Sequence, residues 1–456
     1  MTRRPKGASD IGVEGPGGSD WGGRRTLRGA RNRAEPTTLP LAGVRVIELG
    51  NLIAAPTAGR LLADFGAEVI KVERPRVGDE LRGWRLYAGD TSLLYRTINR
   101  NKMSVEIDLR TDEGRETVLD LIASSDVLIE NFRPGTLDRW GLDRETLASA
   151  NSELVVARIS AYGQTGPLSE RPGYAAVAEA FGGMRELIGD HDRPPARVGV
   201  SIGDSIAGVY AAFGIVASLL DRRERAERGM RPLSPTEREV DVALHEAVFS
   251  MMESLIPDYS AHGVLRKRSG GRMEGIAPSN AYECAGGESV VIAGNGDAIY
   301  IRFMNAIGRH DLATRPDLLG NAGRWASREE LDAAISTWTR ARTRDEVLAS
   351  LEAADVPAGP IYTAKDIVAD AHFEARGMVQ TLDVEVAGET RRVAFPGVVP
   401  LLGDRSVLVS HPGPDLGEHT HEVISELLGR DCPCRACASS QADLEALPSN
   451  TIKGTR

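Results

Sequence analysis

The sequence predicts an α/β protein with a mainly parallel sheet, and two observations carry this prediction. Short apolar segments typical of strands alternate with segments of helical periodicity. The first two apolar segments, VRVIEL at 44–49 and EVIKVE at 68–73, are separated by one helix-length segment, as in a strand–helix–strand unit. Because 456 residues exceed what one core usually supports, we expect a large Rossmann-like α/β domain and a smaller α+β domain.

Each predicted element follows from its local pattern. The segment 54–65 has the apolar spacing of a helix, and DVLIE at 126–130 and LVVARIS at 154–160 are further strand candidates. A polar, helix-compatible segment at 111–124 precedes the first of them. From 205 to 225 the chain is apolar on nearly all sides and then turns basic, which predicts a buried helix whose last turn meets solvent.

Shifts in composition divide the chain. Residues 1–38 are rich in Gly, Arg and Pro and are predicted to be a disordered extension. We expect 39–230 to form the first part of the large domain, 231–370 a linker and the small domain, and 371–430 a segment that returns to the large domain. Residues 431–456 lose apolar periodicity and are predicted to be a flexible tail.

Bulk properties and missing motifs exclude several functions. The net charge of −10 argues against nucleic acid as a partner, and no apolar run of 18 residues predicts a membrane span. The four cysteines fit a reducing cytoplasm. HExxH, G-x-S-x-G and P-loop motifs are missing, and GNLIAAP replaces the dinucleotide fingerprint. Cys284 is expected to be a small buried apolar residue, and no metal site is predicted because a fourth ligand is missing beside Cys432, Cys434 and Cys437.

The stretch RPPARVGVSIGDSIAG brings one carboxylate, Asp204, to the start of the apolar helix. Such an acid can be a helix cap that accepts hydrogen bonds from first-turn N–H groups. It can also be a nucleophile, because the helix N-terminus keeps it ionised and glycines leave room for an acyl group. The residues alone favour the cap. If Asp204 reacts, the N–H groups of Gly203 and Ser205 are candidate oxyanion donors.

Several longer motifs then change this balance. From Leu41 to Gly429 the chain contains, in this order, LAGVRVIELGNLIAAPTAGRLLADFGAEVIKVERP, NRNKMSVEIDLRTDEGR, DVLIENFRPGTLDRWGL, ISAYGQTGP, SIGDSIAG, DVPAGPIYTAKDIVAD, ARGMV and HPGPDLGEHTHEVISELLG. With these motifs in family order, the chain resembles the family III CoA transferases, also called the CaiB/BaiF family, which include formyl-CoA and carnitine CoA transferases and α-methylacyl-CoA racemases.

The resemblance implies that Asp204 attacks an acyl-CoA and passes through an aspartyl-CoA thioester. It also implies that CoA is a substrate, that no cofactor is permanently bound, that small carboxylic acids are the other substrates, and that the protein is an interlocked homodimer. The implied CoA contacts are Leu52, Ile53, Ala54, Arg74, Lys102, Asn131, Arg139 and Tyr174. Each of these polar and aromatic residues also has a purely structural alternative. Arg74 and Arg139 could be solvated surface cations, Lys102 and Asn131 could support turns, and Tyr174 could be a core aromatic residue.

Departures from the family pattern narrow the predicted reaction and the predicted substrates. Family racemases have a histidine where this chain has Tyr174 and Ala175, so racemisation is the alternative rather than the first prediction, and an inactive CoA-binding scaffold is a further alternative. Formyl-CoA transferases have a tetraglycine loop, which Ser269-Gly270-Gly271 only partly matches. The stretch AAVAEAFGGMRELIGD, with Glu179 and Arg185, is similar to transferases of succinyl-CoA and C4 to C5 dicarboxylates. An arginine near the acyl pocket would suit a second carboxylate on the substrate, but Arg185 could equally be a surface residue on a helix.

Overall fold

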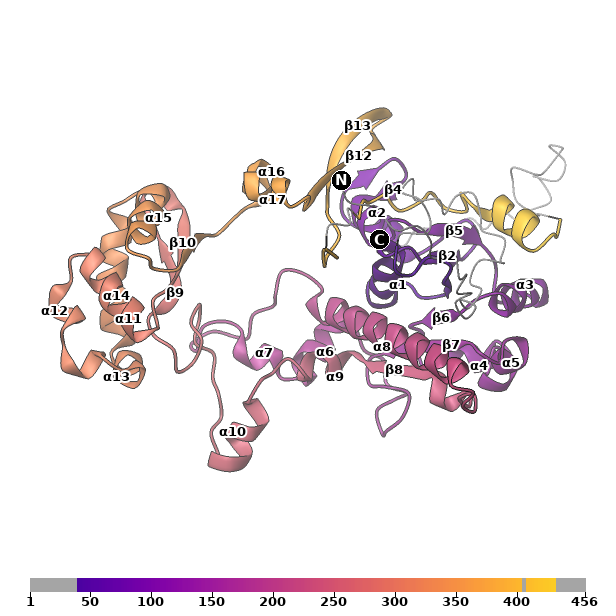
Figure 1. Ribbon diagram of the computed structural model, residues 1–456, viewed down its shortest axis with the longest axis horizontal. Helices are drawn as coiled ribbons and strands as arrows, with labels where there is room; N and C mark the ends of the chain where they lie inside the picture. The colour runs from indigo at the N-terminus through magenta and orange to yellow at the C-terminus, as the bar shows by residue number, and fades with distance from the viewer. Residues whose placement is uncertain (1–38, 404–406, 432–456) are drawn as a thin grey trace, which may run out of the picture.

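A six-stranded parallel sheet forms the centre of the larger part of the protein. The computed structural model describes residues 39–403 and 407–431, and Figure 1 shows this sheet at one end of an elongated molecule. Its strand order is β5-β2-β1-β6-β7-β8, and all neighbouring strands are parallel. The strands are β1 (Arg45–Glu48), β2 (Glu68–Glu73), β5 (Met103–Glu106), β6 (Val127–Glu130), β7 (Val155–Ser160) and β8 (Glu239–Ala243). The predicted α/β fold is confirmed.

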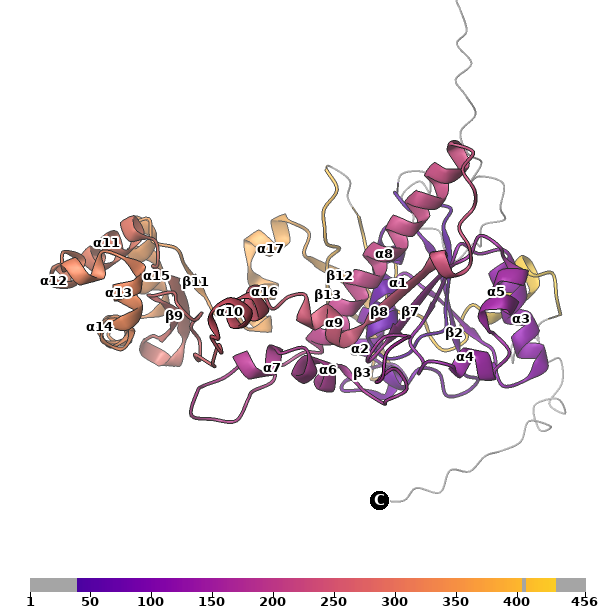
Figure 2. The same ribbon diagram turned by 90° about the horizontal axis from the view of Figure 1, so that it is seen from below.

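Helices cover both faces of this sheet, which explains why its inner strands are buried along almost their whole length, even where they carry charged residues such as Arg45, Glu48 and Lys71. One face packs against α1 (Ala54–Asp64) and α8 (Ile202–Glu227), and the other against α3 (Asp112–Ala123) and α5 (Arg144–Ala150). Figure 2 shows α8 lying along α1. The shorter helices of this part are α2 (Leu93–Ile98), α4 (Thr136–Arg139), α6 (Ala175–Phe181), α7 (Met184–Leu187), α9 (Leu244–Phe249) and α10 (Leu255–His262).

Small residues bring α1 and α8 close together. A Cβ atom added to Gly208 would lie 2.8 Å from the carbonyl oxygen of Ala54 and 2.7 Å from the Cβ atom of Thr57. Only glycine fits at such a distance without displacing one helix. The contact fixes the start of α8 against the start of α1, and the remaining buried residues between these helices include Ala55, Ala58, Ala207 and Ala211.

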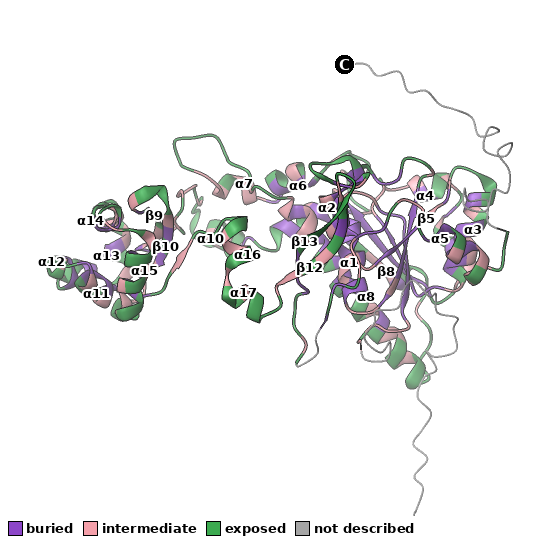
Figure 3. Cartoon of the chain, turned by 90° about the horizontal axis from the view of Figure 1, so that it is seen from above, coloured by how far each residue is buried: buried purple, intermediate pink, exposed green. Residues whose placement is uncertain are grey.

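Two expectations about α8 are corrected. The helix begins at Ile202 rather than Ser205, so Asp204 belongs to its first turn. The helix is also buried on one side only: Ile215 is fully buried, whereas Phe213 is 72% exposed. The exposed apolar stripe, defined as Val209, Phe213, Val216 and Leu220, has helical spacing. Figure 3 shows exposed and buried stretches alternating along α8. An all-apolar sequence cannot reveal which side will be covered.

Among the described residues, α8 alone has the length and composition of a membrane-crossing helix. It packs against α1, α9, β7 and β8, which is the position of a core helix. The strand β8 follows a loop after α8 and pairs with β7, with Val240 opposite Ala157. The large sheet therefore includes residues beyond 230, in the range that the sequence analysis assigned to the linker.

A separate small core lies at the other end of the molecule (Figure 1). It surrounds an antiparallel sheet, in the order β11-β10-β9, and contains Cys284 together with Tyr300, Phe303 and Ile335. The elements are β9 (Ser279–Glu283), β10 (Ser289–Ala293), α11 (Asp297–Ala306), α12 (His310–Ala313), α13 (Asn321–Ala326), α14 (Arg328–Arg340), α15 (Arg344–Ala353) and β11 (Ala358–Pro360). Their side chains form a hydrophobic cluster distinct from those of the large sheet.

The last described segment runs back along the large sheet. After α16 (Ala364–Ala369) and α17 (Ala371–Ala375), the hairpin of β12 (Val379–Val386) and β13 (Glu389–Pro396) packs on β3 (Tyr87–Ala88), which pairs with β4 (Thr91–Ser92). The His419 N–H then donates to the carbonyl oxygen of Ser104 at 3.0 Å, and a short helix, Glu422–Leu427, joins the core. Residues 1–38 and the cysteines Cys432, Cys434 and Cys437 lie outside the described residues.

Candidate active site

Asp204 is the third residue of α8. Ser201 occupies the N-cap position but makes no side-chain cap, and Asp204 makes no cap bond either. The Ser205 N–H donates to the carbonyl oxygen of Ser201 at 3.1 Å, so this group is already used and is not a free oxyanion donor. Within the described chain, the N–H of Gly203 has no partner, as is usual in the first turn of a helix. Gly203 therefore fits the predicted oxyanion role and Ser205 does not.

Burial and two neighbouring charges set the ionisation of Asp204. Burial raises the pKa of its carboxyl group from the usual 3.8 to about 6. Glu179 adds to this rise because it is a like charge, and Arg197 opposes it because it favours the carboxylate. Asp204 is thus ionised at neutral pH, yet it is a stronger base than an ordinary aspartate. Both properties suit a carboxylate that must attack a carbonyl carbon.

Glu179, which lies beside Asp204, holds two arginines. Its carboxylate is 1% exposed, and its Oε2 atom lies 3.2 Å from Nε of Arg185 and 3.7 Å from Nε of Arg197. The Oε1 atom is buried and has no hydrogen-bond partner. A Cβ atom on Gly203 would lie 3.4 Å from Cγ of Glu179, which places Glu179 directly under the turn that carries Asp204.

The sequence analysis mentioned Glu179 and Arg185 but did not assign them to the site, and it did not identify Arg197. Glu179 gave one signal, because it is the only charged residue of the apolar segment that forms α6. Lone charges on buried helix faces need partners. The partners come from α7 and from the loop before α8, and their approach is not visible in local spacing.

Hydrogen bonds to Asp79 and Asn131 hold the predicted turn after β1 in place. Leu52 adopts a left-handed conformation with φ of 65°, and its N–H donates to Oδ1 of Asp79 at 3.0 Å. Asn131 accepts a hydrogen bond from the Asn51 N–H and donates one to the Asn51 carbonyl, both at 2.8 Å. Asn131 therefore supports the turn, which was its structural alternative. Ile53 and Ala54 are buried at the start of α1.

Lys102 lies beneath this turn, inside the protein. Its ammonium group is fully buried and donates to Glu48 at 2.7 Å, to the Pro56 carbonyl at 2.8 Å and to Asn99 at 2.9 Å. Glu48 also binds the buried Lys71 at 3.1 Å. Burial lowers the pKa of Lys102 to about 8. All three N–H donors of Lys102 are used, so a direct bond to CoA would require one of these partners to be released.

The other predicted contacts lie on the surface. Arg74 is half-exposed and pairs with Glu80 at 2.7 Å, and the exposed Arg139 donates to the Thr136 hydroxyl at 2.8 Å. Tyr174 precedes α6 and is 71% exposed, so it is not a core aromatic residue. The backbone of Ala175 lies next to Gly203, which brings Tyr174, Glu179 and Asp204 into one region. No described contact brings Arg74 or Arg139 to Asp204.

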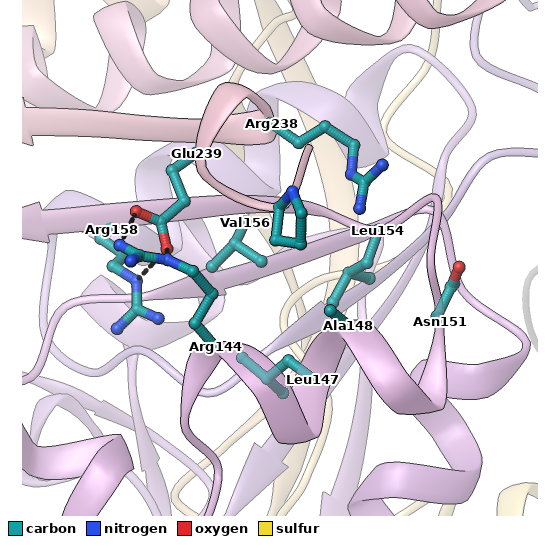
Figure 4. Close-up of a pocket in the computed structure, with 10 residues that line it drawn as sticks. Arg144, Leu147, Ala148, Asn151, Leu154, Val156, Arg158, Arg238 and Glu239 are labelled. Atoms are coloured by element: carbon teal, nitrogen blue, oxygen red, sulfur yellow. Dashed lines mark hydrogen bonds and ion pairs between the residues drawn. The ribbon is translucent and has the colours of Figure 1, made fainter. Parts of the chain in front are cut away.

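Two hollows elsewhere do not contain Asp204. The pocket in Figure 4 lies between α5, β7 and β8, where Arg144 and Arg158 approach Glu239, and its volume of about 10 Å³ accommodates roughly one water molecule. A groove of about 290 Å³ lies beside β8 and α9 and is lined by Tyr210, Glu246 and Ser250. The candidate site is therefore defined by the surroundings of Asp204 at the start of α8 rather than by either hollow.

Comparison with known proteins agrees with this arrangement. The sequence model of CoA-transferase family III matches residues 41–420. The chain is 43% identical over 392 residues to succinyl-CoA–D-citramalate CoA-transferase of Chloroflexus aurantiacus, covering 86% of this chain and 94% of that protein. It is 39% identical over 397 residues to the beta subunit of succinyl-CoA–L-malate CoA-transferase of the same organism, covering 86% and 95%.

A solved structure shows the same fold. A CaiB/BaiF family protein from Brucella suis superposes with a TM-score of 0.74 at 34% identity, and the match covers 85% of this chain and 99% of that one. Sequence, fold and the surroundings of Asp204 therefore lead to one assignment. The chain belongs to CoA-transferase family III, and it is an enzyme that transfers CoA between acyl-CoA and carboxylic acids.

Proposed function

We propose that the chain transfers CoA from succinyl-CoA to a small carboxylic acid through covalent intermediates on Asp204. The observation that carries this proposal is the partly buried carboxylate of Asp204 in the first turn of α8, whose pKa is raised to about 6. The names of the two Chloroflexus relatives support succinyl-CoA as the donor.

The first half of the reaction uses Asp204 as a nucleophile. Its carboxylate attacks the thioester carbonyl of succinyl-CoA, the C–S bond breaks, and CoA leaves as a thiolate. The product is a mixed anhydride between Asp204 and succinate. The thiolate then attacks the side-chain carbonyl of Asp204, and succinate leaves with its electron pair. Asp204 is now an aspartyl-CoA thioester, and no net proton transfer has occurred.

The second half repeats these steps in the opposite direction. A carboxylate of the acceptor acid attacks the aspartyl thioester and releases the CoA thiolate. The thiolate attacks the acceptor carbonyl of the new anhydride, which forms the product acyl-CoA and restores the Asp204 carboxylate. In each step negative charge develops on a carbonyl oxygen, and the unpartnered N–H of Gly203 is a donor for it.

The turn at 51–56 supports binding of CoA. This segment contacts the second turn of α8 at Gly208. A CoA molecule bound along the segment would therefore extend toward Asp204. Arg74 and Arg139 are surface cations suited to the CoA phosphates, and Tyr174 offers an exposed ring near the thioester. Lys102 and Asn131 support CoA binding indirectly, because their side chains hold the turn in place.

We also propose that the protein works as a cytoplasmic homodimer. The apolar stripe on α8 is left uncovered in one chain, and exposed apolar surface of this kind is typical of interfaces.

The racemase alternative requires a second acid–base group next to Asp204. The histidine that family racemases pair with the aspartate is replaced in this chain by Tyr174 and Ala175, and the buried Glu179 beside Asp204 is held by Arg185 and Arg197. Incubation of an α-methylacyl-CoA in deuterated water would introduce deuterium at the α-carbon for a racemase and not for a transferase.

Mass spectrometry tests the covalent proposal. Protein incubated with succinyl-CoA and then with hydroxylamine is expected to contain Asp204 as the hydroxamate. The Asp204→Asn variant is expected to show no modification and a loss of transfer of at least about a thousandfold. Asp190→Asn is the matched control, because Asp190 lies in the preceding loop and is exposed. Absence of the hydroxamate in folded wild-type protein that still binds CoA would contradict the proposal and favour the inactive scaffold.

A further inference from the structure

The cluster of Glu179, Arg185 and Arg197 is incomplete in its hydrogen bonds. Each guanidinium group approaches Glu179 through its Nε atom, and neither arginine has another partner among the described residues. The terminal N–H groups of both arginines therefore remain available, and Oε1 of the buried Glu179 also has no donor. The open guanidinium N–H groups are reached by solvent and can bind an anionic ligand, whereas the buried Oε1 acceptor of Glu179 would be satisfied only by a hydrogen-bond donor.

The position of the cluster relates it to the acyl group. Glu179 lies under Gly203, and both Glu179 and Arg197 are near enough to Asp204 to influence its charge. Arg197 is about half-exposed, with 46% of its side chain accessible, and Arg185 is partly exposed, with 23% accessible. A group entering from solvent toward Asp204 can therefore reach the guanidinium groups, whereas the carboxylate of Glu179 stays covered.

The charge of the cluster changes when Asp204 reacts. In the free enzyme, Asp204 and Glu179 are two anions beside two cations, so the four side chains are balanced. Acylation turns the Asp204 carboxylate into a neutral anhydride, and the departing thiolate takes the negative charge with it. One positive charge then has no partner. A carboxylate at the far end of the acyl group would restore the balance, and an uncharged acyl group would not.

We infer that Arg185 and Arg197, held by Glu179, select the acyl group by binding its distal carboxylate, so that the enzyme prefers dicarboxylic acyl groups over monocarboxylic ones of the same length. Arginine suits this role because its planar fork binds a carboxylate through two parallel hydrogen bonds. Glu179 is the positioning residue, since its buried carboxylate fixes both guanidinium groups. The inference rests on the proposed function and adds the residues that determine specificity.

Competing donors of equal length test the inference. Succinyl-CoA and butyryl-CoA have the same number of acyl carbons and differ in the terminal carboxylate. For the wild-type enzyme, kcat/KM with succinyl-CoA is expected to exceed that with butyryl-CoA by about tenfold to a hundredfold, the range of a hydrogen bond to a charged group. Arg197→Met is expected to remove most of this difference by lowering the value for succinyl-CoA. Arg197→Lys, which keeps the charge, is expected to restore part of it.

The control is Arg193→Met, because Arg193 lies in the same loop, is 76% exposed and contacts only Asp190 at 3.9 Å. It is expected to change neither donor. Equal use of both donors by the wild-type enzyme, or an equal loss with both donors in Arg197→Met, would overturn the inference. The hydroxamate at Asp204 distinguishes these results from failure of the proposed function: if neither donor yields it, the aspartyl mechanism itself is wrong, whereas its formation with both donors at equal rates refutes only the selection by arginine.

Discussion

At the scale of single residues, the proposed chemistry depends on how Asp204 is kept both basic and ionised. A carboxylate with an ordinary pKa is a poor nucleophile, and one with a pKa well above 7 would be protonated at neutral pH. Burial and Glu179 move the pKa of Asp204 upward, and Arg197 limits the rise, so that the value stays near 6. The pKa of Asp204 therefore lies between these two limits.

Removal of the charge on Glu179 has a defined effect on pH dependence. Because Glu179 raises the pKa of Asp204, Glu179→Gln is expected to lower that pKa, by about one unit or less. Asp204 must be ionised to attack, so kcat/KM falls as pH drops through its pKa. The acidic limb of the pH profile, expected near pH 6 in the wild type, should therefore move to lower pH. Glu186→Gln, at an exposed position on α7, serves as the control. A limb that stays in place or moves to higher pH would contradict the assignment of Glu179.

Several site residues were not predictable at this scale. Motifs identified Asp204 and the turn at 52–54, because these segments carry their signal in a few adjacent residues. The motifs did not reveal that Lys102 is buried with three hydrogen-bond partners, or that Asn131 is hydrogen-bonded to Asn51. Most of these partners lie 46 to 80 positions away in sequence, and a single sequence contains no record of which distant residues come into contact.

At the scale of elements, the contact between α1 and α8 determines where Asp204 lies. Gly208 is one turn after Asp204 and has no space for a Cβ atom against Ala54 and Thr57. The two helices can approach only because small residues line both surfaces.

Gly208→Val is therefore expected to separate the two helices. Overpacking of this kind lowers the free energy of unfolding by about 1 to 3 kcal/mol and should also slow the modification of Asp204. Urea unfolding followed by circular dichroism measures the first effect. Ala217→Val, at an exposed position of the same helix, controls for the intrinsic cost of a β-branched residue in a helix. Equal stability of the two variants would show that the contact is not tight.

At the scale of the whole molecule, two hydrophobic cores are connected by extended segments (Figure 1), and the uncovered face of α8 lies on the larger part. The stripe of Val209, Phe213, Val216 and Leu220 is exposed by 41 to 72%. A soluble chain seldom leaves such a row of large apolar side chains in water.

Charge placed on this stripe should separate the subunits. The wild-type protein is expected to have the mass of a dimer by light scattering, and the double substitution of Phe213→Glu with Leu220→Glu is expected to yield monomers, because two buried charges without partners oppose association. Val368→Glu, at an exposed position on α16, is the control and should remain dimeric. A monomeric wild type, or a double variant that remains a dimer, would refute the proposed interface.

The sequence by itself determined the fold class and the family, and it singled out Asp204 as the candidate reactive residue. Strand and helix patterns arise from neighbouring residues, and the motifs from Leu41 to Gly429 are contiguous stretches, so both can be recognised without coordinates. Only the tertiary structure decided which side of α8 is covered, that β8 joins the large sheet, and that Glu179, which lies beside Asp204, pairs with two arginines. The physical reason is common to all three. Each depends on contacts between segments distant in the chain, and those contacts are set by the packing of the whole fold rather than by local periodicity.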